Sequence, residues 1–176
     1  MILIVAGAAG SGKTTVGATI AGQLGWRFAD ADTFHPRANV EKMRAGRPLA
    51  DADRVPWLHA ITSWLDERIA AGETGVVTCS ALRRAYRDLL LDGRPAVTMA
   101  FLLVSEETLR RRVSRRPGHF FPGKLVSSQL ATLEPPSPAL EPRVHVIDAG
   151  GDTAGTASAV IEAVWPHGSA PLRLEQ

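Results

Sequence analysis

The sequence predicts an α/β fold in which a parallel sheet is flanked by helices. Short apolar runs recur along the chain with helix-like stretches between them, which is the pattern of βα units. The first run, at residues 2–6, is followed by a glycine-rich segment and then by a helix-like segment. The length of 176 residues and the 45% hydrophobic content suit one globular domain with a single core.

The order of these patterns sets the expected elements. The apolar runs predict strands at residues 2–6, 26–29, 75–79, 97–104 and 144–147. The stretches around them predict helices at residues 13–24, 37–45, 54–71, 83–91, 106–115, 123–133 and 153–164. Consecutive prolines make residues 134–138 a loop, because proline lacks an N–H donor. Residues 167–176 lack periodicity, so we expect a domain at 1–166 and a mobile tail.

The turn after the first strand carries the clearest motif. Residues 7–14 match G-x-x-x-x-G-K-[ST], in which backbone N–H groups and a helix N-terminus converge on phosphate oxygens. Lys13 is then able to reach the β- and γ-phosphates of ATP, and the Thr14 hydroxyl to bind Mg²⁺. The alternative is an ordinary glycine-rich turn, but Lys13 is one of only three lysines against seventeen arginines. The residues expected to hold ATP here are Gly7, Ala8, Ala9, Gly10, Ser11, Gly12, Lys13, Thr14 and Thr15.

Two carboxylates follow the second strand. Asp30 and Asp32 are two residues apart, so they share one face of an extended segment. At the carboxyl end of a parallel strand they would point toward the crevice beside the phosphate loop. We expect Asp30 to support Mg²⁺ and Asp32 to orient or deprotonate a substrate hydroxyl. The alternative is a polar strand exit in which Asp32 caps a turn before Pro36.

The polar block that follows suits an anionic, hydroxyl-rich ligand. It begins with His35 and Arg37, for which we favour substrate binding over a structural role. Asp51 and Asp53 come before the third expected helix, and two interpretations stay open for them. Either they bind ligand, or Asp53 is the N-cap of a helix that starts at Arg54 and turns Trp57 and Leu58 toward the core.

The third strand ends in small residues. Many phosphate-loop proteins have a metal-binding Asp here, and its absence moves the metal-supporting acid to Asp30. Ser80 allows close approach of a substrate, and arginines, among them Arg87, lie behind it in the sequence. Cys79 is expected to pack as a small apolar residue and not to act in catalysis.

Arginines at residues 110–116 form the last cluster. Arg112 and Arg116 are four residues apart and share a helix face, where they suit a base and a phosphate. A Pro-Gly pair then breaks the helix into a segment, near residues 116–124, which we expect to be a lid. The alternative is a solvated helix end or an RNA contact. Near the C-terminus, Asp148 resembles a metal-binding strand end, but Gly150-Gly151 favours a loop beside the nucleotide base.

Composition argues against several other classes. A formal net charge of +2 does not indicate nucleic-acid binding, although the sequence pI is near 9.1. One cysteine excludes an intrachain disulfide and fits a reducing compartment. The N-terminal apolar run is too short for a signal peptide or a membrane span. We therefore expect a cytoplasmic protein that contacts neither nucleic acid nor membrane.

Together these segments resemble gluconokinases, in order along nearly the whole chain. The segments that carry the resemblance are residues 7–14, Asp30-Ala31-Asp32 with Phe34-His35-Pro36, Asn39 with Lys42-Met43, Asp53-Arg54-x-Pro56-Trp57-Leu58, Cys79-Ser80-Ala81-Leu82 with Tyr86-Arg87-Asp88, and Gly118-His119-Phe120-Phe121. Residues 134–140 depart from the family, because they have fewer acids than often follow the lid helix. The resemblance implies a three-layer, adenylate-kinase-like fold with five parallel strands in order 2-3-1-4-5. It also implies ATP-dependent phosphorylation of D-gluconate to 6-phosphogluconate for the pentose phosphate pathway, usually by a homodimer.

The residues and the resemblance together give one set of expected roles. Lys13, Asp32 and Arg116 are the expected catalytic residues, and Arg112 and Arg116 complete the nucleotide site. The expected substrate-binding residues are Asp32, His35, Arg37, Arg54, Ser80, Arg87 and His119. Two alternatives remain: a kinase of another small metabolite, such as shikimate, and a noncatalytic nucleotide- or RNA-binding protein.

Overall fold

A five-stranded parallel sheet forms the centre of the molecule, which we describe from a computed structural model over residues 1–115 and 124–166. The strands are β1 (Ile2–Gly7), β2 (Arg27–Asp30), β3 (Gly75–Cys79), β4 (Val97–Leu103) and β5 (Val144–Asp148). Their order in the sheet is β2-β3-β1-β4-β5, as the family resemblance implies. β1 is therefore central, and its partners place Ile4 beside Val77 of β3 and Met99 of β4.

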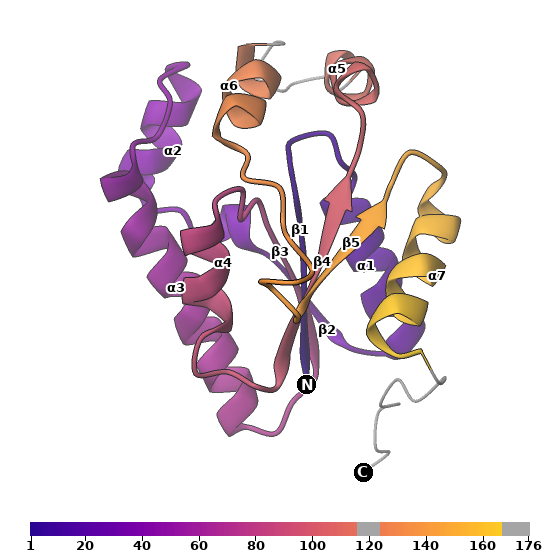
Figure 1. Cartoon of the computed structure of the whole chain (residues 1–176). Coiled ribbons are helices and arrows are strands. Elements are labelled where there is room, and N and C mark those ends of the chain that lie inside the picture. The colour runs from indigo at the N-terminus through magenta and orange to yellow at the C-terminus, as the bar shows by residue number, and fades with distance from the viewer. Residues whose placement is uncertain (116–123, 167–176) are drawn as a thin grey trace.

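Helices cover both faces of this sheet. Figure 1 shows α1 and α7 on one face, α3 and α4 on the other with α2 continuing outward, and α5 and α6 beyond the carboxyl ends of the strands. The helices are α1 (Lys13–Leu24), α2 (Arg37–Arg44), α3 (Asp51–Ala70), α4 (Arg84–Leu91), α5 (Glu106–Ser114), α6 (Lys124–Thr132) and α7 (Thr153–Val164). The layers are thus helix, sheet, helix, which confirms the predicted three-layer class.

Alternation along β1 divides the core into two halves. Leu3 and Val5 pack in the cluster formed with α1 and α7, whereas Ile2, Ile4 and Ala6 pack in the cluster formed with α3 and α4. All five side chains are fully buried. Because every residue of β1 is enclosed, the turn that leaves it starts from a rigid base.

Most predicted boundaries lie within one residue of the observed ones, and three differences have a clear physical reason. β2 starts at Arg27, one residue late, because Trp26 stays with the end of α1 and packs edge-on against Trp165, with ring centroids 5.4 Å apart. An unpredicted 3₁₀ helix, Ala31–Phe34, follows β2, and the Asp30 side chain accepts the Asp32 N–H at its start. α3 starts at Asp51 rather than Arg54, so Pro56 lies inside the helix.

Two predicted features fall outside the described residues. The expected lid near residues 116–124 enters the described part only at Lys124, where α6 begins, and the expected tail at 167–176 lies wholly outside it. Within residues 1–115 and 124–166, no helix has both the length and the apolar composition needed to cross a bilayer.

Candidate active site

A cavity of about 350 Å³ opens at the carboxyl ends of the strands. It is lined by the phosphate loop, the 3₁₀ helix, α2 with the loop after it, the starts of α3 and α4, and α6. Figure 1 shows why these elements meet: parallel strands deliver all their following loops to the same edge of the sheet. Of the predicted site residues, Ala9, Gly10, Gly12, Lys13, Thr14, Asp32, His35, Arg54 and Ser80 line this cavity.

The phosphate loop depends on glycine at two crowded positions. Gly7 has a φ of +141°, and a Cβ there would lie 2.7 Å from the carbonyl oxygen of Leu102. Gly10 has a φ of +85°, and a Cβ there would lie 2.8 Å from Cγ2 of Val113. Side chains at either place would strain the backbone and collide with β4 or α5. The loop therefore keeps its N–H groups close to the cavity and packs against α5.

Lys13 and Thr14 start α1 and present polar atoms at the floor of the cavity. The Lys13 Nζ donates to the carbonyl oxygen of Ala8 at 3.0 Å, so the side chain folds back over the loop. The Thr14 hydroxyl donates to Oδ2 of Asp30 at 3.0 Å. A hydroxyl and a carboxylate, both oxygen donors, suit Mg²⁺ held partly by phosphate oxygens and water. Within residues 1–115 and 124–166, no group of three His, Cys, Asp or Glu side chains is placed to hold a metal ion.

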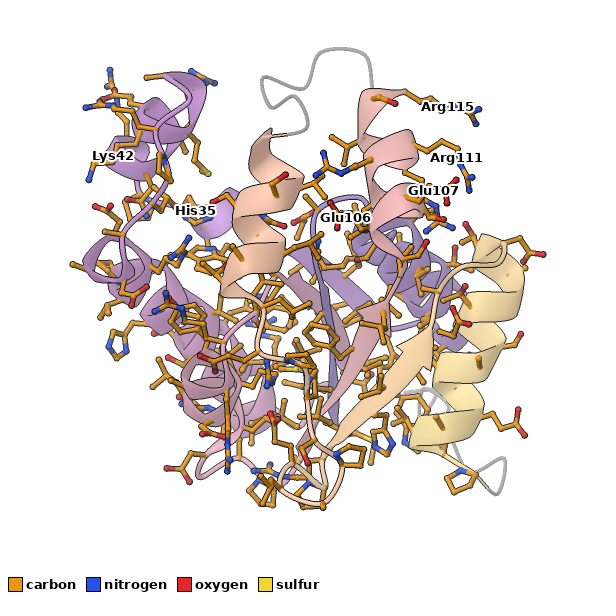
Figure 2. The ribbon with its side chains drawn as sticks, turned by 45° about the horizontal axis from the view of Figure 1, so that its top comes forward. His35, Lys42, Glu106, Glu107, Arg111 and Arg115 are labelled. Atoms are coloured by element: carbon orange, nitrogen blue, oxygen red, sulfur yellow. The ribbon has the colours of Figure 1, made fainter. Side chains whose placement is uncertain are left out.

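The 3₁₀ helix brings Asp32 and His35 to the cavity wall. Its backbone is tied to α3, because the Trp57 indole donates to the Ala31 carbonyl oxygen at 2.6 Å. His35 stacks on Trp57 with ring centroids 4.4 Å apart and planes 12° from parallel. Burial lowers the pKa of His35, and the opposing effects of Asp32 and Arg54 are smaller. His35 is therefore neutral at pH 7 and offers a hydrogen bond rather than a charge. Figure 2 shows it on the inner side of α2, toward α6.

Two arginines expected at the substrate do not line this cavity. Arg37 is on the outer face of α2, where its side chain is 92% exposed and pairs with Glu41 at 2.8 Å. Arg87 is fully buried beneath the site and pairs with Glu141 through two hydrogen bonds of 2.6 and 3.0 Å. Neither guanidinium faces the cavity, so both substrate-binding assignments are corrected.

Arg87 instead supports the turn after β3. Its Nη1 donates to the carbonyl oxygens of Ala81 and Leu82, each at 3.2 Å. Ala81 has a φ of +40°, an uncommon conformation for a residue with a Cβ, and it is fully buried. The buried arginine thus satisfies the carbonyls of a strained turn whose neighbours Ser80 and Leu82 line the cavity. Its contribution to the site is positional.

We expect Arg87→Met to lower the free energy of unfolding by about 3–5 kcal/mol, because it leaves the Glu141 carboxylate buried without its partner. Denaturation in guanidinium chloride measures this loss. Arg37→Met is the matched control, and its free energy of unfolding is expected within about 0.5 kcal/mol of the wild-type value.

Arg87 also holds the pKa of Glu141 below its usual range. The pair's contribution is therefore complete above the unfolded pKa of about 4.3 and fades as pH falls toward the folded value. Equal stability of the two variants would contradict the structural role.

The acids at the start of α3 serve the protein's own structure. Asp53 is not the N-cap: it lies in the first turn, where its carboxylate accepts the Ala50 N–H at 2.9 Å and pairs with Lys42 at 2.5 Å. Asp51 accepts hydrogen bonds from the Tyr86 hydroxyl at 2.5 Å and from Arg83. Tyr86 is the main cause of a lowered Asp51 pKa. Neither acid lines the cavity, which favours the structural interpretation of both.

The arginines of α5 point in two directions, some toward the phosphate loop and others outward. Arg112 donates to the carbonyl oxygens of Ser11 at 3.4 Å and of Gly151 at 3.0 Å, so it joins the phosphate loop to the loop after β5. Figure 2 shows Arg111 and Arg115 pointing outward, away from α6. Asp148 accepts the N–H of Gly150 at 2.9 Å, which makes it a turn-forming residue. The expected lid residues Arg116 and His119 lie outside the described chain.

The contribution of α6 to the cavity was not predicted from the sequence. The Gln129 side chain accepts the N–H of Ala9 in the phosphate loop at 2.6 Å, and Ser128 and Thr132 line the same cavity. The spacing of these residues indicates one helix face, but nothing local indicates that this face meets a loop 120 positions earlier. Cys79, by contrast, packs in the core as predicted, and burial raises its pKa to about 12.

The sheet order, the phosphate loop and the adjoining cavity, which Asp32 and several cationic side chains line, define a P-loop kinase. A family model described as an AAA domain matches residues 2–136. The gluconokinase of Gluconobacter oxydans is 49% identical over 134 residues, which cover 76% of this chain and 75% of that protein. The chain belongs to the gluconokinase family.

Solved structures agree with this assignment. A gluconokinase from Sinorhizobium meliloti superposes with a TM-score of 0.80 at 41% identity, over 92% of this chain and 90% of that one. An unliganded sugar kinase from Janibacter superposes with a TM-score of 0.85 at 40% identity, over 93% of each chain. The shikimate kinase of Bacteroides thetaiotaomicron, at 19% identity and a TM-score of 0.61 over 92% of this chain and 96% of that one, shares the fold alone.

Proposed function

We propose that this protein transfers the γ-phosphoryl group of ATP to D-gluconate and forms 6-phospho-D-gluconate. The observation that carries the proposal is one cavity in which the phosphate loop, Asp32 and a cationic wall face each other. Membership in the gluconokinase family supports the substrate, since the relatives at 37–49% identity are named gluconokinases or probable gluconokinases.

The chain's own residues supply positioning and electrostatics, which are what phosphoryl transfer needs. Mg·ATP, when bound, supplies the phosphoryl group and its leaving group. Lys13 and the loop amides would hold the phosphates, and Thr14 with Asp30 would hold the metal. Asp32 would orient the primary hydroxyl of gluconate or accept its proton. His35, Arg54 and Ser80 would bind the rest of the sugar acid, and Arg112 would lie at the nucleotide. Arg116 and His119 remain predicted partners from the lid.

A coupled ADP-release assay on a panel of acceptors tests the reaction. We expect turnover with D-gluconate and Mg·ATP, and less than about one hundredth of that kcat/KM with shikimate or D-glucose, a ratio that polar recognition reaches. The preference should follow from the cavity's cations and its carboxylate, which fit a polyhydroxy acid. Shikimate as the better acceptor would replace gluconate with the alternative substrate.

An RNA-binding role has less support. Arg110 pairs with Glu106 on its own helix at 2.6 Å, and Arg112 is engaged by backbone carbonyls, so only part of the cluster faces outward. This alternative predicts salt-sensitive RNA affinity and no ADP release with any sugar acid.

We also propose, on the family resemblance, a cytoplasmic homodimer that feeds the pentose phosphate pathway. The single, buried cysteine is consistent with a reducing compartment. Light scattering after size exclusion measures the assembly directly, and a mass near 18.8 kDa would identify a monomer instead.

A further inference from the structure

Three side chains form one wall of the cavity on the side of α3 and α4. Arg54 comes from the first turns of α3, and Arg83 and Tyr86 come from the start of α4. All three contact the same carboxylate: Asp51 accepts from the Tyr86 hydroxyl at 2.5 Å, from Arg54 at 3.3 Å and from Arg83. The Arg83 guanidinium also lies over the Tyr86 ring, 6.0 Å from its centroid. The wall is therefore fixed before any ligand arrives.

The charges of this wall do not cancel. Arg54 and Arg83 contribute two positive charges and Asp51 contributes one negative charge, which leaves one positive charge facing the cavity. Within the described chain, the polar contacts of both arginines use Nη1 alone. A guanidinium carries five N–H donors in a planar fork that matches a carboxylate. The wall can therefore accept one more anion without losing its hold on Asp51.

The position of this wall in the fold indicates which anion it binds. Arg112 and the Gly150–Gly151 loop mark the nucleotide side, next to α5 and α7, whereas this wall lies on the opposite face of the sheet, beside α3 and α4 (Figure 1). Between the two lie the phosphate loop and Asp32, where the hydroxyl would react. A sugar acid whose terminal hydroxyl is at Asp32 would direct its carboxylate toward the wall.

Arg44 and Arg47 also line the cavity, but both are exposed on α2 and the loop that follows. The Arg54 and Arg83 side chains are only 26% and 35% exposed and are already oriented by Asp51. Ordering a long side chain at a binding site costs free energy, so the preordered pair is the better carboxylate site.

We propose that Arg83, together with Arg54, binds the carboxylate of the acceptor, and that Asp51 and Tyr86 hold the pair in place. Arg83 thereby takes the substrate-binding role that was predicted for Arg37 and Arg87. The proposal rests on the proposed reaction and adds its specificity: the wall selects a sugar acid over the corresponding uncharged polyol.

The test compares Arg83→Met with Arg84→Met, its neighbour, which lies outside this cavity and pairs with Asp88. We expect Arg83→Met to raise the KM for D-gluconate by about 10- to 100-fold, the effect of one charge-assisted hydrogen-bonding partner, and to change kcat less. The KM for D-glucitol, which lacks the carboxylate, should stay near the wild-type value, and so should ADP affinity measured by calorimetry. The KM of Arg83→Lys for D-gluconate should fall between those of the wild type and Arg83→Met, since lysine keeps the charge but not the planar fork of N–H donors. Arg84→Met should match wild type.

Several results would overturn the proposal. An unchanged KM for gluconate in Arg83→Met, or equal increases for gluconate and glucitol, would remove Arg83 from the carboxylate site. A larger effect from Arg47→Met would move the site to the exposed rim of the cavity. If the proposed reaction is wrong, the wild type will release no ADP with gluconate. In that case calorimetric titration with gluconate still reports whether Arg83→Met weakens gluconate binding, so the two proposals can fail separately. Thermal unfolding of each variant shows whether it is folded.

Discussion

Replacing Lys13 with alanine should lower kcat by on the order of 1,000-fold while the protein stays folded. The Lys13 ammonium lies over the phosphate loop, 3.0 Å from the Ala8 carbonyl oxygen, at the floor of the cavity. There it would meet phosphate oxygens whose charge shifts during transfer, so its loss weakens the transition state more than the ground state. Single-turnover kinetics at saturating ATP and gluconate isolates this effect from binding.

Lys42 provides a matched control for that substitution. It is also a lysine on a helix near the cavity, but it pairs with Asp53 at 2.5 Å and does not line the cavity. Lys42→Ala should therefore retain kcat within a few fold and lose some stability, as expected for a partly exposed ion pair. Near-normal kcat in folded Lys13→Ala would refute the phosphate-loop assignment.

The second large effect is expected at Asp32. Asp32→Asn should lower kcat by about 100- to 10,000-fold, the contribution of a positioned general base. Its carboxylate lines the cavity between the phosphate loop and the stacked pair of His35 and Trp57. ATP affinity, measured by calorimetry without gluconate, should be nearly unchanged because the phosphate loop and Lys13, and not Asp32, are the residues expected to hold the nucleotide.

Asp30→Asn separates the two acids. Asp30 accepts the Thr14 hydroxyl at 3.0 Å, so this change should raise the Mg²⁺ concentration needed for half-maximal activity and leave turnover at saturating Mg²⁺ less affected. A Mg²⁺ titration of both variants provides the comparison. The same loss of kcat and the same Mg²⁺ dependence in both would argue against distinct roles for Asp30 and Asp32.

Patterns along the chain predicted most of the fold, because they reflect local physics. Continuous apolar runs indicate buried parallel strands, and β3, α1 and α7 begin and end at the predicted residues. The predicted start of α3 was wrong because Asp53 is a residue type that suits an N-cap, which places the first helical residue at Arg54 instead of Asp51. The actual start depends on the Asp53 carboxylate, which reaches back to the Ala50 N–H.

The site was predictable where its residues are adjacent in sequence and unpredictable where it depends on distant partners. The phosphate loop and the Asp30–Asp32 pair are contiguous motifs, and the structure places them side by side. Arg87 was wrongly assigned to the substrate because its partner, Glu141, lies 54 residues further along the chain. The ion pair with Glu141 holds the guanidinium in the core. Gln129 escaped notice for the same reason, since only the tertiary fold brings α6 to Ala9.

The burial of Cys79 turns the sheet itself into a reporter. The thiol is 1% exposed in β3, between β1 and β2, and is the only cysteine in the chain. A thiol reagent can modify Cys79 only while the central strands are separated. The labelling rate therefore measures how often the protein is in this open state. Any molecule that binds only the closed protein makes openings rarer by the factor 1 + [L]/Kd. Mass spectrometry of one cysteine over time would thus give the affinity of ATP, gluconate or an inert analogue, in variants that catalyse nothing.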